Sequence, residues 1–266
     1  MSNTNKTISV IIPIHELNDQ TKSLLAESIG SVIAQISRPN ELVLVVPKGS
    51  DAEKFVTDTY SNALEGATKI VSNDGKTDFS SQVNLGVEKA SSEWVSILEM
   101  DDVYSRIWFK NVQEYITAYP SVELFLPIVV EVNNKGFAGL KNEPVWAHGF
   151  AEEMGILDHT TLLGYNDFNI DGSVFKKSII EEHGGLKANL KLAFTYEFLL
   201  RLTYKDVKTM VIPKYGYQHL TGRDESLLVQ TTKSMDTVEA RWWVEMAKKE
   251  SFFPNDRKLT YELIEE

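Results

Sequence analysis

The chain contains the stretch Trp94-Val95-Ser96-Ile97-Leu98-Glu99-Met100-Asp101-Asp102, in which an apolar run ends in three carboxylates. The apolar part predicts a buried strand. Like charges at this density repel one another, so they indicate a bound cation between them. Mg²⁺ or Mn²⁺ suits such a site, because both ions take carboxylate oxygens together with the phosphates of a substrate. The alternative is an acidic turn that opens the next helix, with Asp101 or Asp102 as its N-cap.

Apolar runs alternate with segments of helical periodicity in the first part of the chain. The predicted strands are Ile8 to Pro13, Leu42 to Val46, Ala67 to Val71 and Trp94 to Leu98. This alternation predicts an open parallel sheet, which binds ligands beyond the carboxyl ends of its strands. The acidic residues lie at one of these ends, and Pro13-Ile14-His15-Glu16 and Pro47-Lys48-Gly49 lie at two others. The convergence favours a binding site over a helix cap.

The second part of the chain is less regular. The segment 137–163 mixes glycine, aromatic residues and short helical pieces, which is typical of an insertion that lines a site. Strands are predicted at 122–132, 169–175 and 208–213, helices at 176–183 and 195–204, and a polar loop at 214–226. We therefore predict one α/β domain over residues 1–227, with a mostly parallel central sheet flanked by helices, and a helical C-terminal extension over 228–266.

Composition narrows the classes of protein. The 266 residues are 42% hydrophobic, which is enough for a large core. The chain has no cysteine, so a metal must be held by oxygen or imidazole. The net charge of −11 disfavours nucleic-acid binding. No apolar run approaches the ~18 residues that a membrane span needs, so we expect a soluble, cytoplasmic protein.

Eight segments follow one another in a recognisable order. They are Val10-Ile11-Ile12-Pro13, Ser28 to Gln35, Pro39 to Leu42, Asn84-Leu85-Gly86, Glu99 to Asp102, Asp171 to Lys177, Glu181 to Leu186, and Tyr196 to Leu202. In this order they resemble glycosyltransferases of family 2 with the GT-A fold, and Glu99 to Asp102 stand at the place of the family's D-x-D signature. The resemblance covers roughly Ile8 to Leu227. It implies a Rossmann-like GT-A domain with a nucleotide-sugar half at about 7–104 and an acceptor half at about 105–227. The sequence Trp242-Trp243 with Lys248 to Phe253 is similar to phage-encoded members, and for such a member the location would be the host cytoplasm.

The resemblance also implies an activity. The expected enzyme uses Mn²⁺ or Mg²⁺ to move a hexosyl or pentosyl group from a nucleotide diphosphate sugar, with a UDP-sugar favoured, to a hydroxyl on a glycan, a protein or a modified base. The expected mechanism is a single displacement with inversion, in which the cation stabilises the leaving diphosphate and a carboxylate takes the acceptor's proton.

The resemblance assigns roles to particular residues. The predicted metal ligands are Asp102 first, then Asp101, His219 and Glu99. The predicted nucleotide-sugar contacts are Pro13, Ile14, His15, Glu16, Lys48, Asn84, Asp101 and Arg223. Glu197 is the candidate catalytic base; its alternative is a helix residue that pairs with Arg201 at i,i+4.

Two departures from the family's pattern keep other functions open. Pro47-Lys48 stand where the family commonly has an aspartate that reads the base, and Thr195 stands where its catalytic aspartate is usual. One alternative is a non-catalytic relative that binds a nucleotide or a sugar. The other is a nucleotidyltransferase, although Pro13-Ile14-His15-Glu16 lacks the glycine-rich, basic character that holds a triphosphate.

Overall fold

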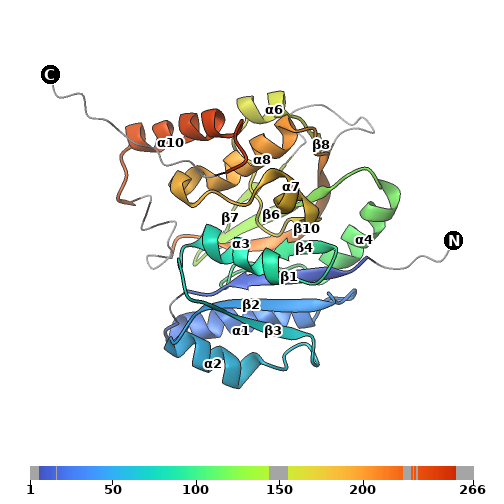
Figure 1. The fold of residues 1–266 in the computed structure, drawn as a ribbon, viewed down its shortest axis with the longest axis vertical. Coiled ribbons are helices and arrows are strands. Elements are labelled where there is room, and N and C mark those ends of the chain that lie inside the picture. Colours follow the sequence, from blue (N-terminus) through green and yellow to red (C-terminus); the bar gives the residue numbers. More distant parts are fainter. Residues whose placement is uncertain are drawn as a thin grey trace.

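The structure is a computed structural model, and it describes residues 6–15, 17–143, 155–223, 229, 231 and 233–255. A central sheet is flanked by helices on both faces (Figure 1). The strands are β1 (Ile8–Pro13), β2 (Glu41–Pro47), β3 (Thr68–Asn73), β4 (Trp94–Ile97), β5 (Val103–Tyr104), β6 (Leu124–Asn133), β7 (Gly136–Lys141), β8 (Ile156–Leu157), β9 (Val174–Lys176) and β10 (Thr209–Leu220). The helices are α1 (Asp19–Ile33), α2 (Asp51–Tyr60), α3 (Phe79–Lys89), α4 (Trp108–Ala118), α6 (His159–Gly164), α7 (Ser178–His183), the 3-10 helix η1 (Ala188–Ala193), α8 (Phe194–Tyr204) and α10 (Thr237–Glu250).

The sheet has the order β3-β2-β1-β4-β9-β6-β10-β5, with β7 paired to β6 and β8 paired to β10. The pairs among β3, β2, β1 and β4 are parallel, as the sequence predicts. Beyond β4 the sheet is mixed, because β9 runs antiparallel to both β4 and β6, while β6 and β10 are parallel. The parallel arrangement is therefore confined to the N-terminal half and the β6–β10 pair.

The apolar runs form strands that are buried on both faces. In β1, Ile8, Val10 and Ile12 belong to one core cluster, and Ile11 belongs to the cluster on the other face. All these side chains are 0–1% exposed. A strand between two helical layers needs apolar residues at every position rather than at alternate ones, which explains the unbroken runs.

Helix α3 lies close against β1. Asp78 caps the helix by accepting from the Ser81 backbone N–H. A Cβ at Gly86 would lie 2.4 Å from Ile11 Cγ2, so only glycine allows this approach. The close packing fixes the first turns of α3 beside the carboxyl end of β1.

Helix α10 packs on α8 and η1 rather than standing apart from the domain. Trp243 and Ala247 of α10 are buried in the core cluster that contains α8. Burial of this face stabilises α10 through tertiary packing. The described part of the predicted C-terminal extension thus shares the core of the second half.

Two predicted boundaries are wrong. The segment 214–220, predicted as part of a loop, continues β10, because its backbone pairs with β6 on one side and β5 on the other. The predicted strand 169–175 becomes a turn as far as Ser173, and Gly172 has a φ of 68°. For 214–220, pairing with strands that are distant in the sequence decides the conformation, although the local composition is typical of a loop.

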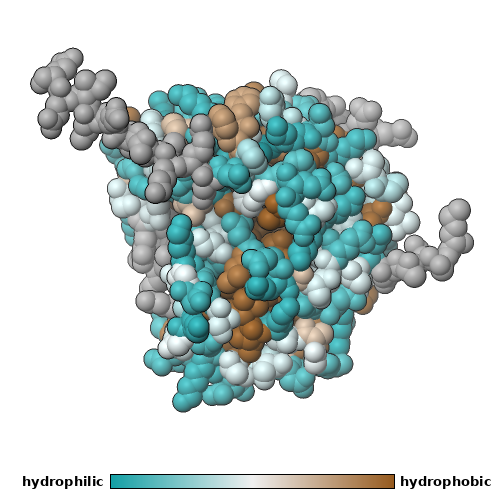
Figure 2. All heavy atoms as spheres, in the orientation of Figure 1, coloured by the Kyte–Doolittle hydropathy of each residue, from teal (hydrophilic) through white to brown (hydrophobic). Residues whose placement is uncertain are grey.

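The face shown in Figure 2 is largely hydrophilic, with a band of hydrophobic residues near its centre. In the parts of the chain that the structure describes, no helix is long and apolar enough to cross a bilayer.

Candidate active site

The candidate site lies beside β1, where the order of strands in the sheet reverses. Strands β2 and β3 lie on one side of β1, and β4 lies on its other side. The carboxyl ends of β1 and β4 therefore border the crevice that binds ligands in open α/β sheets. His15 follows β1, and the acidic stretch that ends in Asp102 follows β4.

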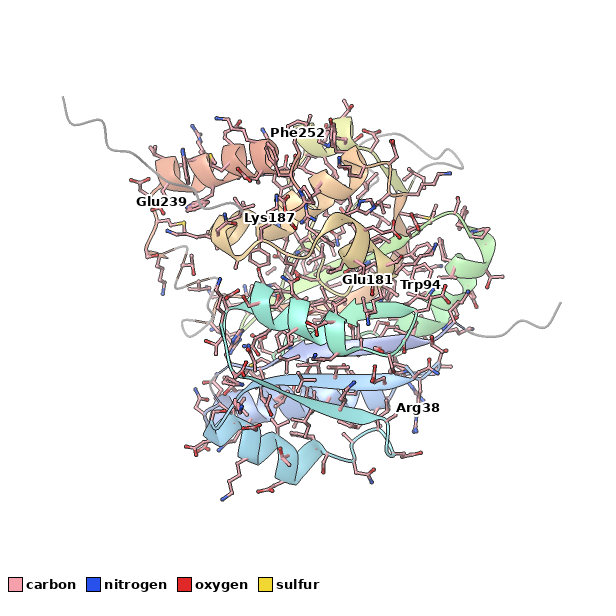
Figure 3. All side chains as sticks on the ribbon, in the orientation of Figure 1. Arg38, Trp94, Glu181, Lys187, Glu239 and Phe252 are labelled. Carbon is pink, nitrogen blue, oxygen red and sulfur yellow. The ribbon has the colours of Figure 1, made fainter. Side chains whose placement is uncertain are left out.

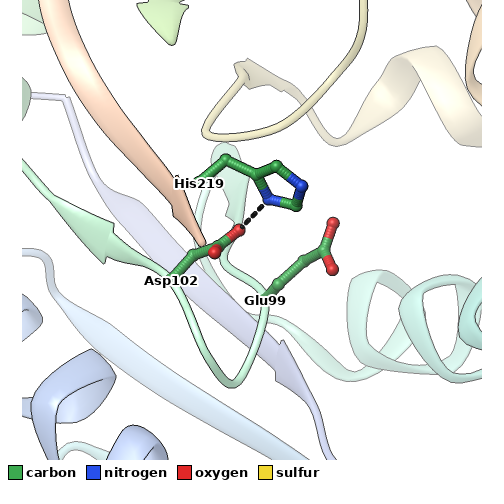
Figure 4. Close-up of side chains that lie close together, drawn as sticks. All are labelled: Glu99, Asp102 and His219. Carbon is green, nitrogen blue, oxygen red and sulfur yellow. Dashed lines mark hydrogen bonds and ion pairs between the residues drawn. The ribbon is translucent and has the colours of Figure 1, made fainter. Parts of the chain in front are cut away.

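The acidic stretch forms a tight turn that is held at both ends. The Leu98 backbone N–H donates to Ile11 O at 3.0 Å, which continues the β4–β1 pairing by one residue. The Asp102 N–H then donates to Glu99 O at 3.2 Å, and Ser28 Oγ donates to the same carbonyl at 3.1 Å. The turn directs Glu99 and Asp102 to the same side, toward β10 (Figure 4).

Asp102 is buried and accepts three hydrogen bonds from β10. Its Oδ2 accepts from Tyr217 Oη and from His219 Nδ1, both at 2.8 Å, and its Oδ1 accepts from the Leu220 N–H at 2.8 Å. Tyr217 Oη also accepts from the Glu99 N–H at 3.0 Å. Burial raises the pKa of Tyr217 well above its ordinary value, so the phenol keeps the proton that it donates. These bonds join the end of β10 to the acidic turn.

Glu99 and His219 face each other beside Asp102 (Figure 4). Burial, together with the charges of Asp171 and Asp102, raises the pKa of Glu99 to about 8. Burial lowers the pKa of His219, but the hydrogen bond and charge of Asp102, with the charges of Glu99 and Asp171, raise it to about 10. Such mutual shifts show a concentration of negative charge that a cation would stabilise.

One ligand atom each from Glu99, Asp102 and His219 lies within 4.8 Å of the others. Carboxylate oxygens and an imidazole nitrogen are suitable ligands for Mn²⁺ and Mg²⁺, with imidazole favouring Mn²⁺. The structure therefore brings together three of the four predicted metal ligands.

The fourth predicted ligand, Asp101, pairs instead with Arg223. A carboxylate oxygen of Asp101 contacts Arg223 Nη2, and the two side chains are 13% and 14% exposed. A guanidinium thus neutralises this carboxylate. Asp101 and Arg223, both predicted to contact the donor, lie together at the edge of the site.

Glu197, the predicted catalytic base, is buried between two basic side chains. Its side chain has no exposed surface and pairs with Arg201 Nε at 2.8 Å and with Lys187 Nζ at 2.9 Å. Arg201 Nη2 also donates to its second oxygen at 3.1 Å. Lys187 lies below α10 in the view of Figure 3. These pairs favour the alternative reading, the i,i+4 pair with Arg201, and the catalytic role of Glu197 stays a prediction.

The side chain of Asn84 also makes hydrogen bonds within the fold. Its Nδ2 donates to Leu186 O at 2.9 Å, and its Oδ1 accepts from the Leu186 N–H at 2.8 Å. This reciprocal pair ties α3 to the segment between α7 and η1. The predicted contact of Asn84 with the donor stays a prediction.

The remaining predicted donor contacts lie at the carboxyl ends of β1 and β2. Ile14 is buried, His15 is partly exposed, and the Lys48 N–H donates to Asn73 O at 2.8 Å. Pro13 ends β1, and Glu16 is outside the described residues. Their contact with a nucleotide stays a prediction.

The sequence did not single out Asp171 or Tyr217 as site residues. Asp171 lies in the turn before β9, where Asn169 Nδ2 donates to its Oδ2 at 2.5 Å. Burial raises the pKa of Asp171 to about 6; the charge of His219 opposes this shift and that of Asp102 adds to it. A Cβ at Gly172 would lie 2.5 Å from Tyr217 Cδ2, so this turn packs directly on the site. The Asp-Gly pair was the available signal, since it is typical of a turn.

The fold and the site define an α/β protein whose candidate site lies beyond the carboxyl ends of β1 and β4. A model of glycosyl transferase family 2 matches residues 9–184, and the chain belongs to this family. Comparison with curated proteins gives no significant match.

Solved structures of TarS from S. aureus share the fold. The complex of TarS 1–349 with UDP has a TM-score of 0.63 and 15% identity, over 92% of this chain and 72% of that one. The complex with UDP-GlcNAc has a TM-score of 0.61 and 15% identity, over 93% and 73%. A further crystal structure of S. aureus TarS has a TM-score of 0.56 and 16% identity, over 93% of this chain and 44% of that one. The predicted GT-A fold is confirmed.

Proposed function

We propose that the protein transfers a sugar from a nucleotide diphosphate sugar, with a UDP-sugar favoured, to a hydroxyl acceptor, and that a divalent cation assists the transfer. The observation that carries the proposal is the cluster of Glu99, Asp102 and His219 at the β1–β4 crevice of a family 2 fold. The structures of TarS with UDP and with UDP-GlcNAc support this class of donor.

Glu99 and His219 Nε2 fit a cation best. Among the described residues, the Glu99 carboxylate has no hydrogen-bond partner, and His219 uses only Nδ1, toward Asp102. A carboxylate that accepts from Nδ1–H orients an imidazole and makes Nε2 a better ligand. We therefore assign Asp102 mainly to orienting His219, although Oδ1, with one hydrogen bond, could still reach the ion.

Asp101 would complete the site when its partner moves. The Arg223 guanidinium neutralises Asp101 in the structure, and the same group can bind a diphosphate bidentately. Donor binding would thus exchange one anionic partner of Arg223 for another and release Asp101 toward the cation.

The proposed reaction is a single displacement with inversion. The acceptor oxygen forms a bond to the anomeric carbon, and the bond from that carbon to the diphosphate oxygen breaks with its electron pair on the leaving group. A bound divalent cation supplies Lewis-acid stabilisation of that leaving group. Arg223 is placed to add positive charge to the same diphosphate.

Asp171 replaces Glu197 as our candidate for the proton acceptor. It is a carboxylate of the same crevice, held by Asn169, and its charge raises the pKa of Glu99 and of His219. A carboxylate in hydrogen-bond reach of the attacking hydroxyl is what general-base catalysis needs.

The proposal is tested by product analysis. The protein is incubated with UDP-, GDP- and ADP-sugars, with MnCl₂, MgCl₂ or EDTA, and the released nucleotide is identified. We expect release of a nucleoside diphosphate that EDTA abolishes. Pyrophosphate release would instead identify a nucleotidyltransferase. Donor binding without turnover of any donor or acceptor would identify a non-catalytic relative, which the burial of Glu197 leaves as the second candidate.

A further inference from the structure

A buried amide lies beside His15 at the same crevice. Gln82, in the second turn of α3, has no exposed surface. It contacts His15, which follows β1, and Thr77, which precedes the helix. A polar side chain in this position needs partners for both ends of its amide.

The amide can take only one orientation. Gln82 Nε2 lies 2.9 Å from Thr77 O and 3.0 Å from His15 Nδ1. The carbonyl of Thr77 only accepts, so the group facing it must be the NH₂ and not the oxygen. Gln82 Oε1 is therefore left over, and within the described ranges it has no hydrogen-bond partner.

The carbonyl of Thr77 also faces His15. His15 Nδ1 lies 3.0 Å from Thr77 O and 3.0 Å from Gln82 Nε2. Because the carbonyl only accepts, it can receive an N–H from the imidazole as well as one from the amide. Burial lowers the pKa of His15, and the hydrogen bond to Thr77 O opposes this shift. Neither contact uses Gln82 Oε1, which stays an acceptor without a partner among the described residues.

Three other side chains of the described residues near this edge already accept hydrogen bonds. Glu53 accepts from the Gly49 N–H and from Ser72 Oγ. The Asn73 side chain closes the turn that follows β3, where its Oδ1 accepts from the Gly75 N–H and its Nδ2 donates to Lys76 O. Asp78 caps α3. Lys48, after β2, brings a donor where an acceptor would be needed to receive a base N–H.

We propose that Gln82 Oε1 reads the base of the donor nucleotide by accepting its ring N–H. The proposal rests on the proposed function, because it needs a nucleotide in the β1–β4 crevice. It deepens that function by naming the class of base, a ring N–H beside a carbonyl, which uracil and guanine present and cytosine and adenine do not. His15 is partly exposed, and a base that enters beside its ring shifts the ring and uncovers Gln82 Oε1.

The test combines a change in the protein, which removes the Gln82 amide, with a change in the ligand, which removes the N–H of the uracil ring. Isothermal titration measures UDP and N3-methyl-UDP, with CDP and GDP as further arms, on the wild type and on Gln82→Met. We expect N3-methylation to lower the affinity of the wild type for UDP at least 10-fold. In Gln82→Met it should lower the affinity less than threefold, because the acceptor for the N–H is absent. If the wild type binds GDP more tightly than UDP, the base whose ring N–H Gln82 accepts is guanine.

Two results would overturn the proposal. The first is that the wild type binds UDP and N3-methyl-UDP equally well, and this comparison needs no variant. The second is that methylation lowers the affinity equally in the wild type and in Gln82→Met, which would show that the effect of the methyl group is steric. Gln113→Met, at a half-buried position of α4 where the amide pairs with the Lys6 backbone, is the matched control and should keep the wild-type ratio. Loss of binding to every nucleoside diphosphate in the wild type would instead contradict the proposed function itself.

Discussion

His219 Nδ1 lies 2.8 Å from Asp102 Oδ2, and this bond connects the end of β10 to the turn after β4. Tyr217 Oη donates to the same oxygen at 2.8 Å and accepts from the Glu99 N–H. The arrangement gives the imidazole one orientation, with Nε2 pointing away from Asp102 (Figure 4). The acidic turn and the strand end thus form one unit, and each part holds the other in place for a ligand.

Asp102→Asn should weaken Mn²⁺ binding without abolishing it. Loss of a carboxylate that orients a metal-bound imidazole typically costs about 10- to 100-fold in affinity. His219→Ala should cost more, because it removes a ligand. Titration of the protein with Mn²⁺, with free ion followed by electron paramagnetic resonance, measures both.

Tyr217→Phe is the matched control for this comparison. It removes a hydrogen bond to Asp102 but leaves the His219–Asp102 pair, so its effect on Mn²⁺ affinity should be smaller than that of Asp102→Asn. The opposite ranking of Mn²⁺ affinities, in which Asp102→Asn abolishes binding and His219→Ala has no effect, would show that Asp102 is the ligand and that His219 does not bind the ion.

The stability of the metal-free protein should fall as pH rises from about 5 to about 10. The folded-state pKa of Glu99 is raised to about 8 from 4.5, and that of His219 to about 10 from 6.5. The folded protein then binds more protons than the unfolded chain throughout these intervals, so the free energy of unfolding decreases with pH. Urea denaturation in EDTA at several pH values measures the slope.

Two substitutions separate the contributions to this slope. Glu99→Gln should flatten the profile between about pH 4.5 and 8, and His219→Gln should flatten it between about pH 6.5 and 10. A free energy of unfolding that rises across this range in the wild type would contradict both assignments.

The sequence predicted those parts of the fold that depend on local pattern. The apolar runs of β1 and β4 are unbroken because both faces of these strands are buried. Such runs are typical of a parallel sheet, so they predict one before the neighbouring strands are known. The acidic residues that follow β4 lie at the crevice because parallel strands share a carboxyl edge. Both features are consequences of the N-terminal half alone.

The roles within the site could not be predicted in the same way, because they depend on contacts over long sequence separations. The donors to Asp102 come from Tyr217, His219 and Leu220, more than 110 residues along the chain. The i,i+4 spacing of Glu197 and Arg201 was visible, but its burial depends on Lys187. No local pattern contains this information.

Glu197→Gln should destabilise the protein rather than act on chemistry alone. Removal of the charge leaves Lys187 and Arg201 buried without their carboxylate, and breaking a buried ion pair costs about 3–5 kcal/mol. Urea denaturation should show this loss. Glu239→Gln is the control, because its pair with Lys191 is exposed and should contribute little. A stable Glu197→Gln variant with lost turnover would restore the catalytic role.

Asp171→Asn should lower turnover and leave donor binding intact. The amide keeps the size of the side chain but cannot accept the proton of the attacking hydroxyl, and loss of a general base costs about 100-fold or more in kcat. Steady-state transfer with the donor found in the product screen measures kcat, and titration with UDP measures binding. Asp167→Asn is the matched control, because Asp167 is on the same segment but pairs with Lys141 at an exposed position. If Asp171→Asn weakens donor binding and kcat at saturating donor is unchanged, Asp171 holds the sugar, and the proton goes to another group or to water.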